Sequence, residues 1–160
     1  MKEFPTAKMD NRTKVFTFIF VLLAVLAVYL LYFYSDFEKE FIWIPIVFLI
    51  AAGVAAYLMS PKIFIVNNVI YIKSKFTSVR IPVKDVAGIK RFPEVGLNFR
   101  LFGVGGVFGY FGYFNGGDVW YVTNIYKKVK IKTGKKLYVI SPENPEEFIN
   151  EVNKIKQNLI

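Results

Sequence analysis

The residue types that carry most enzymatic chemistry are scarce in this sequence. It contains no cysteine and no histidine, which excludes thiolate nucleophiles, disulfides, Cys/His zinc sites and imidazole acid–base catalysis. Ser141 has no imidazole to activate it, and Asp85, Glu94 and Asp118 stand alone in the sequence. We therefore expect a non-enzymatic protein without a cofactor or metal site.

A glycine-rich stretch is the first segment to test as a ligand-binding loop. Residues 103–117, GVGGVFGYFGYFNGG, hold seven of the eleven glycines. A dinucleotide-binding loop is excluded because Phe108 stands where the third glycine of G-x-G-x-x-G should fall, and no βαβ unit surrounds it. Two interpretations remain. Either the glycines mark bends of a curved sheet whose core holds the aromatics, or some aromatics are exposed and contact lipid headgroups or a partner protein. The aromatic residues concerned are Phe108, Tyr110, Phe111, Tyr113 and Phe114.

Lysines alternate with apolar residues in a later segment, so they share one face of a predicted strand. These lysines are Lys128, Lys130 and Lys132, with Lys135 and Lys136 in the adjoining turn. One interpretation is a solvated strand face. The other is a face for anionic lipids, because an anionic leaflet attracts each nearby lysine by about 1 kcal/mol. Nucleic acid is not favoured, since no recognisable binding motif accompanies the charge.

Two uncharged hydrophobic runs precede these segments. Residues 15–34 and 41–59 contain 20 and 19 residues, and as helices each would span about 30 Å, the thickness of a bilayer core. The loop 35–40 joins them, which predicts a transmembrane helical hairpin over 15–59. Basic residues concentrate in the tail 1–14 and after the second run, so both termini are predicted to be cytoplasmic and the loop 35–40 outside.

Small residues on the second run would let another helix approach closely. They are Ala52, Gly53 and Ala56. The partner could be the first run of the same chain or a helix of another subunit, and the sequence leaves both open.

Residues 60–160 are predicted to form one cytoplasmic domain. They carry 16 Lys/Arg against 7 Asp/Glu, and their short β-branched and aromatic runs predict about seven antiparallel strands. Asn67-Asn68 indicates a tight hairpin between residues 62–66 and 69–73. A C-terminal amphipathic helix should follow Asn144, a good N-cap. Its apolar stripe consists of Phe148, Val152, Ile155 and Leu159.

Three motifs carry a resemblance to a known family: IPVKDVAGI (81–89), RLFGVGGVFGYFG (100–112) and ISPENPEEF (140–148). With them, residues 62–158 resemble the bacterial PH-like (pleckstrin-homology-like) domain family, whose members are often tethered to membranes by one or two N-terminal helices. The resemblance implies a bent antiparallel sheet capped by the C-terminal helix, and no particular activity. Lys73-Ser74-Lys75 only partly matches the basic pair of phosphoinositide-binding PH domains. The Asn67-Asn68 turn is also too short to hold a headgroup, so that specificity is not expected.

Together these features predict a PH-like barrel anchored to a prokaryotic cytoplasmic membrane. Its expected function is a non-enzymatic binding or scaffold module that contacts anionic lipid headgroups or a protein partner. The alternative is a structural or accessory subunit of a larger membrane complex, or a homo-oligomer, assembled through the hydrophobic helices and the glycine/aromatic stretch.

Overall fold

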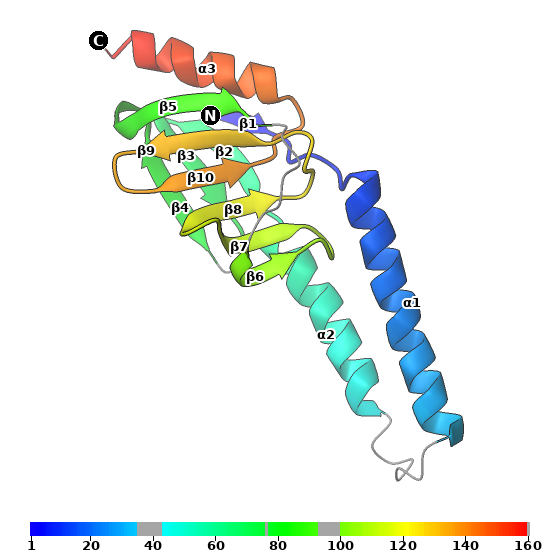
Figure 1. The fold of residues 1–160 in the computed structure, drawn as a ribbon. Helices are drawn as coiled ribbons and strands as arrows, with labels where there is room; N and C mark the ends of the chain where they lie inside the picture. Colours follow the sequence, from blue (N-terminus) through cyan, green and yellow to red (C-terminus); the bar gives the residue numbers. More distant parts are fainter. Residues whose placement is uncertain (35–42, 76, 93–99, 160) are drawn as a thin grey trace.

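The computed structural model describes residues 1–34, 43–75, 77–92 and 100–159. Two long helices, α1 (Asn11–Tyr34) and α2 (Trp43–Met59), extend side by side from one end of a sheet domain (Figure 1). The third helix, α3 (Pro145–Gln157), lies on the side of the domain away from them. The chain enters the domain before α1 and returns to it directly after α2.

The predicted two-span hairpin is not confirmed. Among the described residues, α1 is the one helix long and apolar enough to cross a membrane, over Asn11–Phe33 with a mean hydropathy of 2.7. Helix α2 is apolar but has 17 described residues, or about 25 Å of helix. The predicted loop 35–40 and the start of the second predicted span lie outside the described residues.

The described residues form ten strands in two sheets, more than the seven predicted. The four-stranded sheet has the order β1 (Lys2–Phe4), β2 (Lys62–Val66), β3 (Val69–Lys73), β4 (Ser78–Pro82). The six-stranded sheet has the order β5 (Val86–Arg91), β9 (Val129–Thr133), β10 (Leu137–Ile140), β8 (Asp118–Val122), β7 (Tyr110–Phe114), β6 (Arg100–Gly105). Adjacent strands are antiparallel except β8 and β10, which are parallel, so the fully antiparallel prediction is also corrected.

Two strands account for most of the difference in number. The N-terminal tail supplies β1, which pairs with β2. The glycine-rich stretch and its preceding residues supply both β6 and β7, in which Gly103 lies opposite Gly112. A Cβ on Gly103 would lie 2.0 Å from the Phe111 carbonyl oxygen, and one on Gly112 would lie 2.2 Å from that of Phe102. Glycine is therefore required here because the two backbones approach too closely for any side chain.

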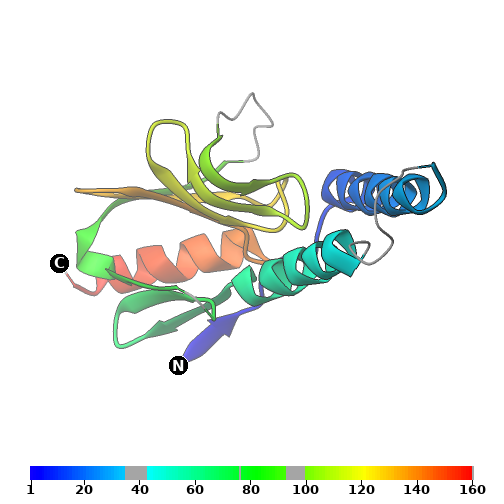
Figure 2. The same ribbon diagram turned by 90° about the horizontal axis from the view of Figure 1, so that it is seen from below.

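The main core lies between the two sheets and under α3, as seen from below in Figure 2. Phe4 of β1 meets Phe148 of α3 edge to face, with ring centroids 5.0 Å apart. The predicted C-terminal helix is confirmed: the Asn144 side chain caps it by accepting the Glu147 N–H at 3.2 Å. The helix ends before Leu159, which is exposed and does not join the apolar stripe.

Helix α1 is fixed to the sheet domain by hydrogen bonds at its start. The buried Asp10 carboxylate accepts the N–H groups of Thr13 and Ile125, both at 2.9 Å. One turn further on, the Thr17 hydroxyl accepts the Phe108 N–H at 2.8 Å. The tail 1–14 and the glycine-rich turn therefore hold α1 in place.

Candidate functional site

The aromatic residues of the glycine-rich stretch divide between core and surface. Phe111 and Phe114 are buried, and Phe114 stacks on Trp120 with ring centroids 4.8 Å apart. Phe108 and Tyr110 are half-buried, while Tyr113 is 45% exposed. Packing therefore explains Phe111 and Phe114, and Tyr113 presents the largest free aromatic surface of the predicted set.

Two residues of β6 that the sequence analysis did not single out are more exposed than any of these. Leu101 is 65% exposed and Phe102 is 76% exposed. Strand β6 is the edge of the six-stranded sheet and lies beside the domain end of α2 (Figure 1). Phe102 also lines a small, mainly apolar crevice of about 160 Å³, together with Met59 of α2 and Phe111.

The predicted lysine face is not one continuous surface. Lys128 is fully buried, and its ammonium lies over the rings of Phe92 and Trp120, 4.4 and 4.9 Å from their centroids. The sequence suggested that Lys128 is part of an exposed lipid face. Because its side chain is buried, this interpretation is corrected. Lys130 is half-buried and also lies over Phe92, at 5.0 Å. Phe92 and Trp120 therefore cover part of a strand face that the alternation of lysines with apolar residues predicts to be exposed to solvent.

Lys132, Lys135 and Lys136 are exposed at the turn between β9 and β10. In both ribbon views this turn lies at the end of the sheet opposite to α1 and α2 (Figures 1 and 2). The predicted lysines and the hydrophobic helices are therefore not brought together.

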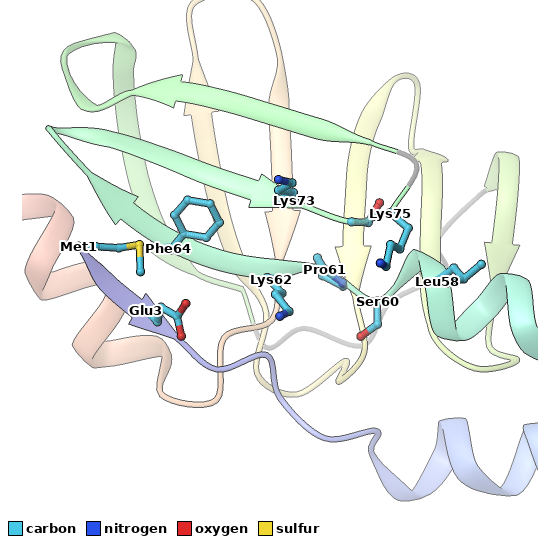
Figure 3. Close-up of a pocket in the computed structure, with 10 residues that line it drawn as sticks. Met1, Glu3, Leu58, Ser60, Pro61, Lys62, Phe64, Lys73 and Lys75 are labelled. Carbon is cyan, nitrogen blue, oxygen red and sulfur yellow. The ribbon is translucent and has the colours of Figure 1, made fainter.

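A different group of lysines lies where α2 joins the sheet domain. Lys62 of β2, Lys73 of β3 and Lys75 of the following loop line a pocket of about 520 Å³ (Figure 3). Its walls also include Leu58 of α2 and Phe64 of β2. Glu3 of β1 is the one carboxylate among the described residues that line it.

The backbone explains why these lysines converge. The Asn67-Asn68 turn sets a register in which Lys62 lies directly opposite Lys73 on the outer face of the sheet. The Lys75 N–H donates to the Leu58 carbonyl at 3.2 Å, which fixes the loop to the last turn of α2. A cation at this position also complements the negative end of the helix dipole.

Ion pairing leaves this end of the domain with uncompensated positive charge. Elsewhere, carboxylates of α3 and its cap pair with basic residues: Glu147 and Glu151 with Lys2, Glu146 with Arg91, and Glu143 with Lys127. Within the described part of the chain, none of Lys62, Lys73 and Lys75 has a carboxylate within 4 Å. The described ion pairs therefore gather around α3, and the lysines next to α2 have Glu3 as the one described carboxylate in their pocket.

The pocket has the chemistry of an anion-binding site. Three ammonium groups supply up to nine N–H donors, and the hydroxyls of Ser60 and Ser74 lie in the same wall. The side chains offer no activated nucleophile. The described residues also contain no cluster of three acidic side chains that could hold a metal ion.

Among the small residues of α2, Gly53 has open space beside it. Ala52 and Gly53 are partly exposed, and a Cβ added to Gly53 would meet no described atom within 4 Å. The side chain of Ala56 lies outside what the structure describes. The Gly53 side of α2 is therefore open to lipid or to another helix.

The architecture identifies the class: two packed sheets closed by a C-terminal amphipathic helix, as in pleckstrin-homology-like domains. A family model described as "Bacterial PH domain" matches residues 53–156, more than half of the chain and including the last turns of α2. The chain therefore belongs to the bacterial PH domain family, and PH domains are in general non-catalytic binding modules. Comparisons with curated proteins and with solved structures gave no match.

Proposed function

We propose that this chain is a membrane-anchored, non-catalytic binding module whose PH domain contacts anionic lipid headgroups on the cytoplasmic face of a prokaryotic membrane. The observation that carries the proposal is the surface at the domain end of α2. Exposed apolar side chains of β6 and unpaired lysines gather there, beside the apolar helices. Such a combination suits an interface in which hydrocarbon meets charged headgroups.

The energies support a role in orienting the domain. Full burial of one large apolar side chain contributes about 1.5–3 kcal/mol, and each lysine near an anionic leaflet adds about 1 kcal/mol. Leu101, Phe102 and the three pocket lysines could together contribute several kcal/mol. Because α1 already attaches the chain, these contacts would hold one face of the PH domain against the lipid.

The absence of cysteine from the sequence allows a direct test. Leu101→Cys and, as the matched control, Asn153→Cys on the exposed side of α3 each give a single labelling site. Each variant is labelled with an environment-sensitive fluorophore and reconstituted into vesicles containing phosphatidylglycerol. Quenching by lipids that carry a shallow nitroxide should be strong at residue 101 and weak at residue 153. Equal, weak quenching at both sites would refute the proposed contact.

A second function is favoured by the open side of α2. The space beside Gly53 would accept a helix of another subunit, in which case the protein would be an accessory or structural subunit of a membrane complex. Gly53→Leu should then dissociate a complex that survives mild detergent, whereas Val54→Leu on the exposed helix surface should not. Identical elution of wild type and Gly53→Leu as monomers would exclude this alternative.

A further inference from the structure

We infer that the outer face of the four-stranded sheet, formed by β1, β2, β3 and β4, is an interface between two copies of this chain. The two copies pack face to face about a two-fold axis that runs along the strands. This interface goes beyond the proposed lipid contact of β6, and it rests on the proposed function only for the shared membrane that keeps both copies parallel.

An apolar surface lies on this sheet face, and no described element covers it. Figure 2 shows α3 and the six-stranded sheet on one side of the four-stranded sheet, and no described helix or strand on its other side. Phe64 and Tyr71 lie directly opposite each other there and stack, with ring centroids 5.1 Å apart. The half-buried apolar and aromatic side chains of this face are Phe64, Val66, Val69, Tyr71 and Pro82. Sheet faces that meet water are usually polar, so this one resembles the inner face of a sheet sandwich.

Opposite charges stand at the two borders of the same face. Glu3 of β1 lies opposite Phe64. Phe64 lies opposite Tyr71, which in turn lies opposite Arg80 of β4. One row across the sheet therefore begins with an exposed carboxylate and ends with an exposed guanidinium. Three strand spacings, about 14 Å, separate these two charges within one chain, and neither has an ion-pair partner among the described residues.

The membrane determines how two such faces can meet. Strand β2 follows α2 closely and continues in nearly the direction of that helix (Figures 1 and 3). Two copies in one membrane are related by an axis parallel to their helices, and this axis also runs along the strands. Rotation about it exchanges the borders of the sheet, so Glu3 of each copy meets Arg80 of the other. Because a two-fold interface is self-complementary, every dimer gains this ion pair twice.

The size and the lysines of the face determine how strong the contact can be. Four strands of about five residues cover roughly 300 Å² per copy, below the roughly 800 Å² per partner of a stable complex. We therefore expect a dimer that forms when a membrane concentrates the chains and that dissociates in dilute detergent. Lys62 and Lys73 lie at the α2 end of the face, where their long side chains can extend toward the headgroups and away from the contact.

The absence of cysteine from the sequence permits a cross-linking experiment on the full-length chain. Val66→Cys places one thiol close to the proposed axis, and Asn153→Cys on the exposed side of α3 is the matched control. Both variants are reconstituted into vesicles of phosphatidylcholine and phosphatidylglycerol at equal protein-to-lipid ratios and treated with a short bis-maleimide. We expect a cross-linked dimer from Val66→Cys and only collisional background from Asn153→Cys.

Charge reversal in the Val66→Cys background tests whether Glu3 meets Arg80. Glu3→Arg and Arg80→Glu, each alone, turn both attractions into repulsions and should lower the dimer yield roughly tenfold. When the two variants are mixed in one vesicle, opposite charges face each other again at both contacts, so dimers between the variants should return. A small tag on one variant identifies these mixed dimers. Lys154→Glu, at an exposed position of α3, should leave the yield unchanged, and thermal melts verify that every variant is folded.

Several outcomes would overturn the interface. Equal cross-linking at residues 66 and 153 would do so, as would single charge reversals without effect or mixed variants that stay monomeric. Dimers that are lost on Gly53→Leu but ignore the charges of Glu3 and Arg80 would place the contact in the helices. Protection of the Val66→Cys thiol in vesicles that hold single copies would show that lipid covers this face. Fluorophore quenching at residue 101 is independent of these results, so the proposed lipid contact and the interface can fail separately.

Discussion

Substitution of Phe4 by alanine tests whether the N-terminal tail is part of the PH domain. Phe4 is 3% exposed, belongs to a three-residue strand paired with β2, and meets the ring of Phe148. Replacing a buried phenylalanine by alanine costs about 3–5 kcal/mol. Because β1 is a short edge strand that can adjust, we expect a value near the lower limit, about 3 kcal/mol.

The assay is unfolding of the full-length protein in detergent, followed by near-ultraviolet circular dichroism. For a chain of this size, 1 kcal/mol lowers Tm by about 2–4 °C, so Phe4→Ala should lower it by roughly 6–12 °C. Lys2→Ala is the control from the same strand. It removes the partly exposed ion pairs with Glu147 and Glu151 and the contact of its ammonium with the Phe4 ring at 5.4 Å, but it leaves the Phe4 side chain in the core. Because exposed ion pairs contribute little to stability, Lys2→Ala should lower Tm much less than Phe4→Ala. A Tm for Phe4→Ala equal to that of Lys2→Ala would refute the packing of β1 into the core.

Three further predictions concern the glycine pair, the attachment of α1 and the acidic residues near α3. Gly112→Ala should destabilise the protein by at least 1–3 kcal/mol in thermal melts, roughly the cost of a strained backbone alone, whereas Gly134→Ala, where a Cβ meets nothing within 4 Å, should be tolerated. Asp10→Ala leaves the buried N–H groups of Thr13 and Ile125 without their acceptor, so hydrogen exchange should accelerate at both amides. The expected loss of stability is about 2–4 kcal/mol, and Asp10→Asn should restore part of it. The hydrogen bond from Lys127 lowers the pKa of Glu143 in the folded state. The pair therefore stabilises the fold fully above 4.5, the ordinary pKa of a glutamate, and this stabilisation is lost as pH falls through the lower pKa of the folded state. Lys127→Gln should therefore reduce stability at neutral pH and have little effect in strong acid, and an equal effect at both would contradict the assignment.

Local signals in the sequence were sufficient for part of this fold. Asn144 marks the start of α3, and the Asn67-Asn68 turn fixes the β2–β3 hairpin, because both act through neighbouring residues. Strand β1 could not be found this way. It has three residues and pairs with a strand about sixty residues later, so no periodicity reveals it. The sequence does not separate β6 from β7, because glycines in a strand usually indicate bends, whereas Gly103 and Gly112 permit a close approach of the two backbones.

The candidate site was only partly accessible from sequence. Alternation correctly groups the lysines of β9 on one face, but it does not reveal that Phe92 and Trp120 cover Lys128. Lys62 and Lys73 could have been paired by counting outward from the Asn67-Asn68 turn, five residues on each side. Lys75 joins them only because its loop bonds to the end of α2, a contact that no local pattern encodes.

The side of the membrane that the PH domain occupies is the most direct test of the whole account. Asn153→Cys gives the protein a single thiol on the exposed side of α3, away from the helices. Intact cells and inside-out membrane vesicles are treated with a membrane-impermeant maleimide. We predict labelling in the inverted vesicles and none in intact cells, with the protein resisting alkaline extraction from the membrane. Labelling in intact cells, or release of the protein by alkali, would contradict an anchored cytoplasmic module.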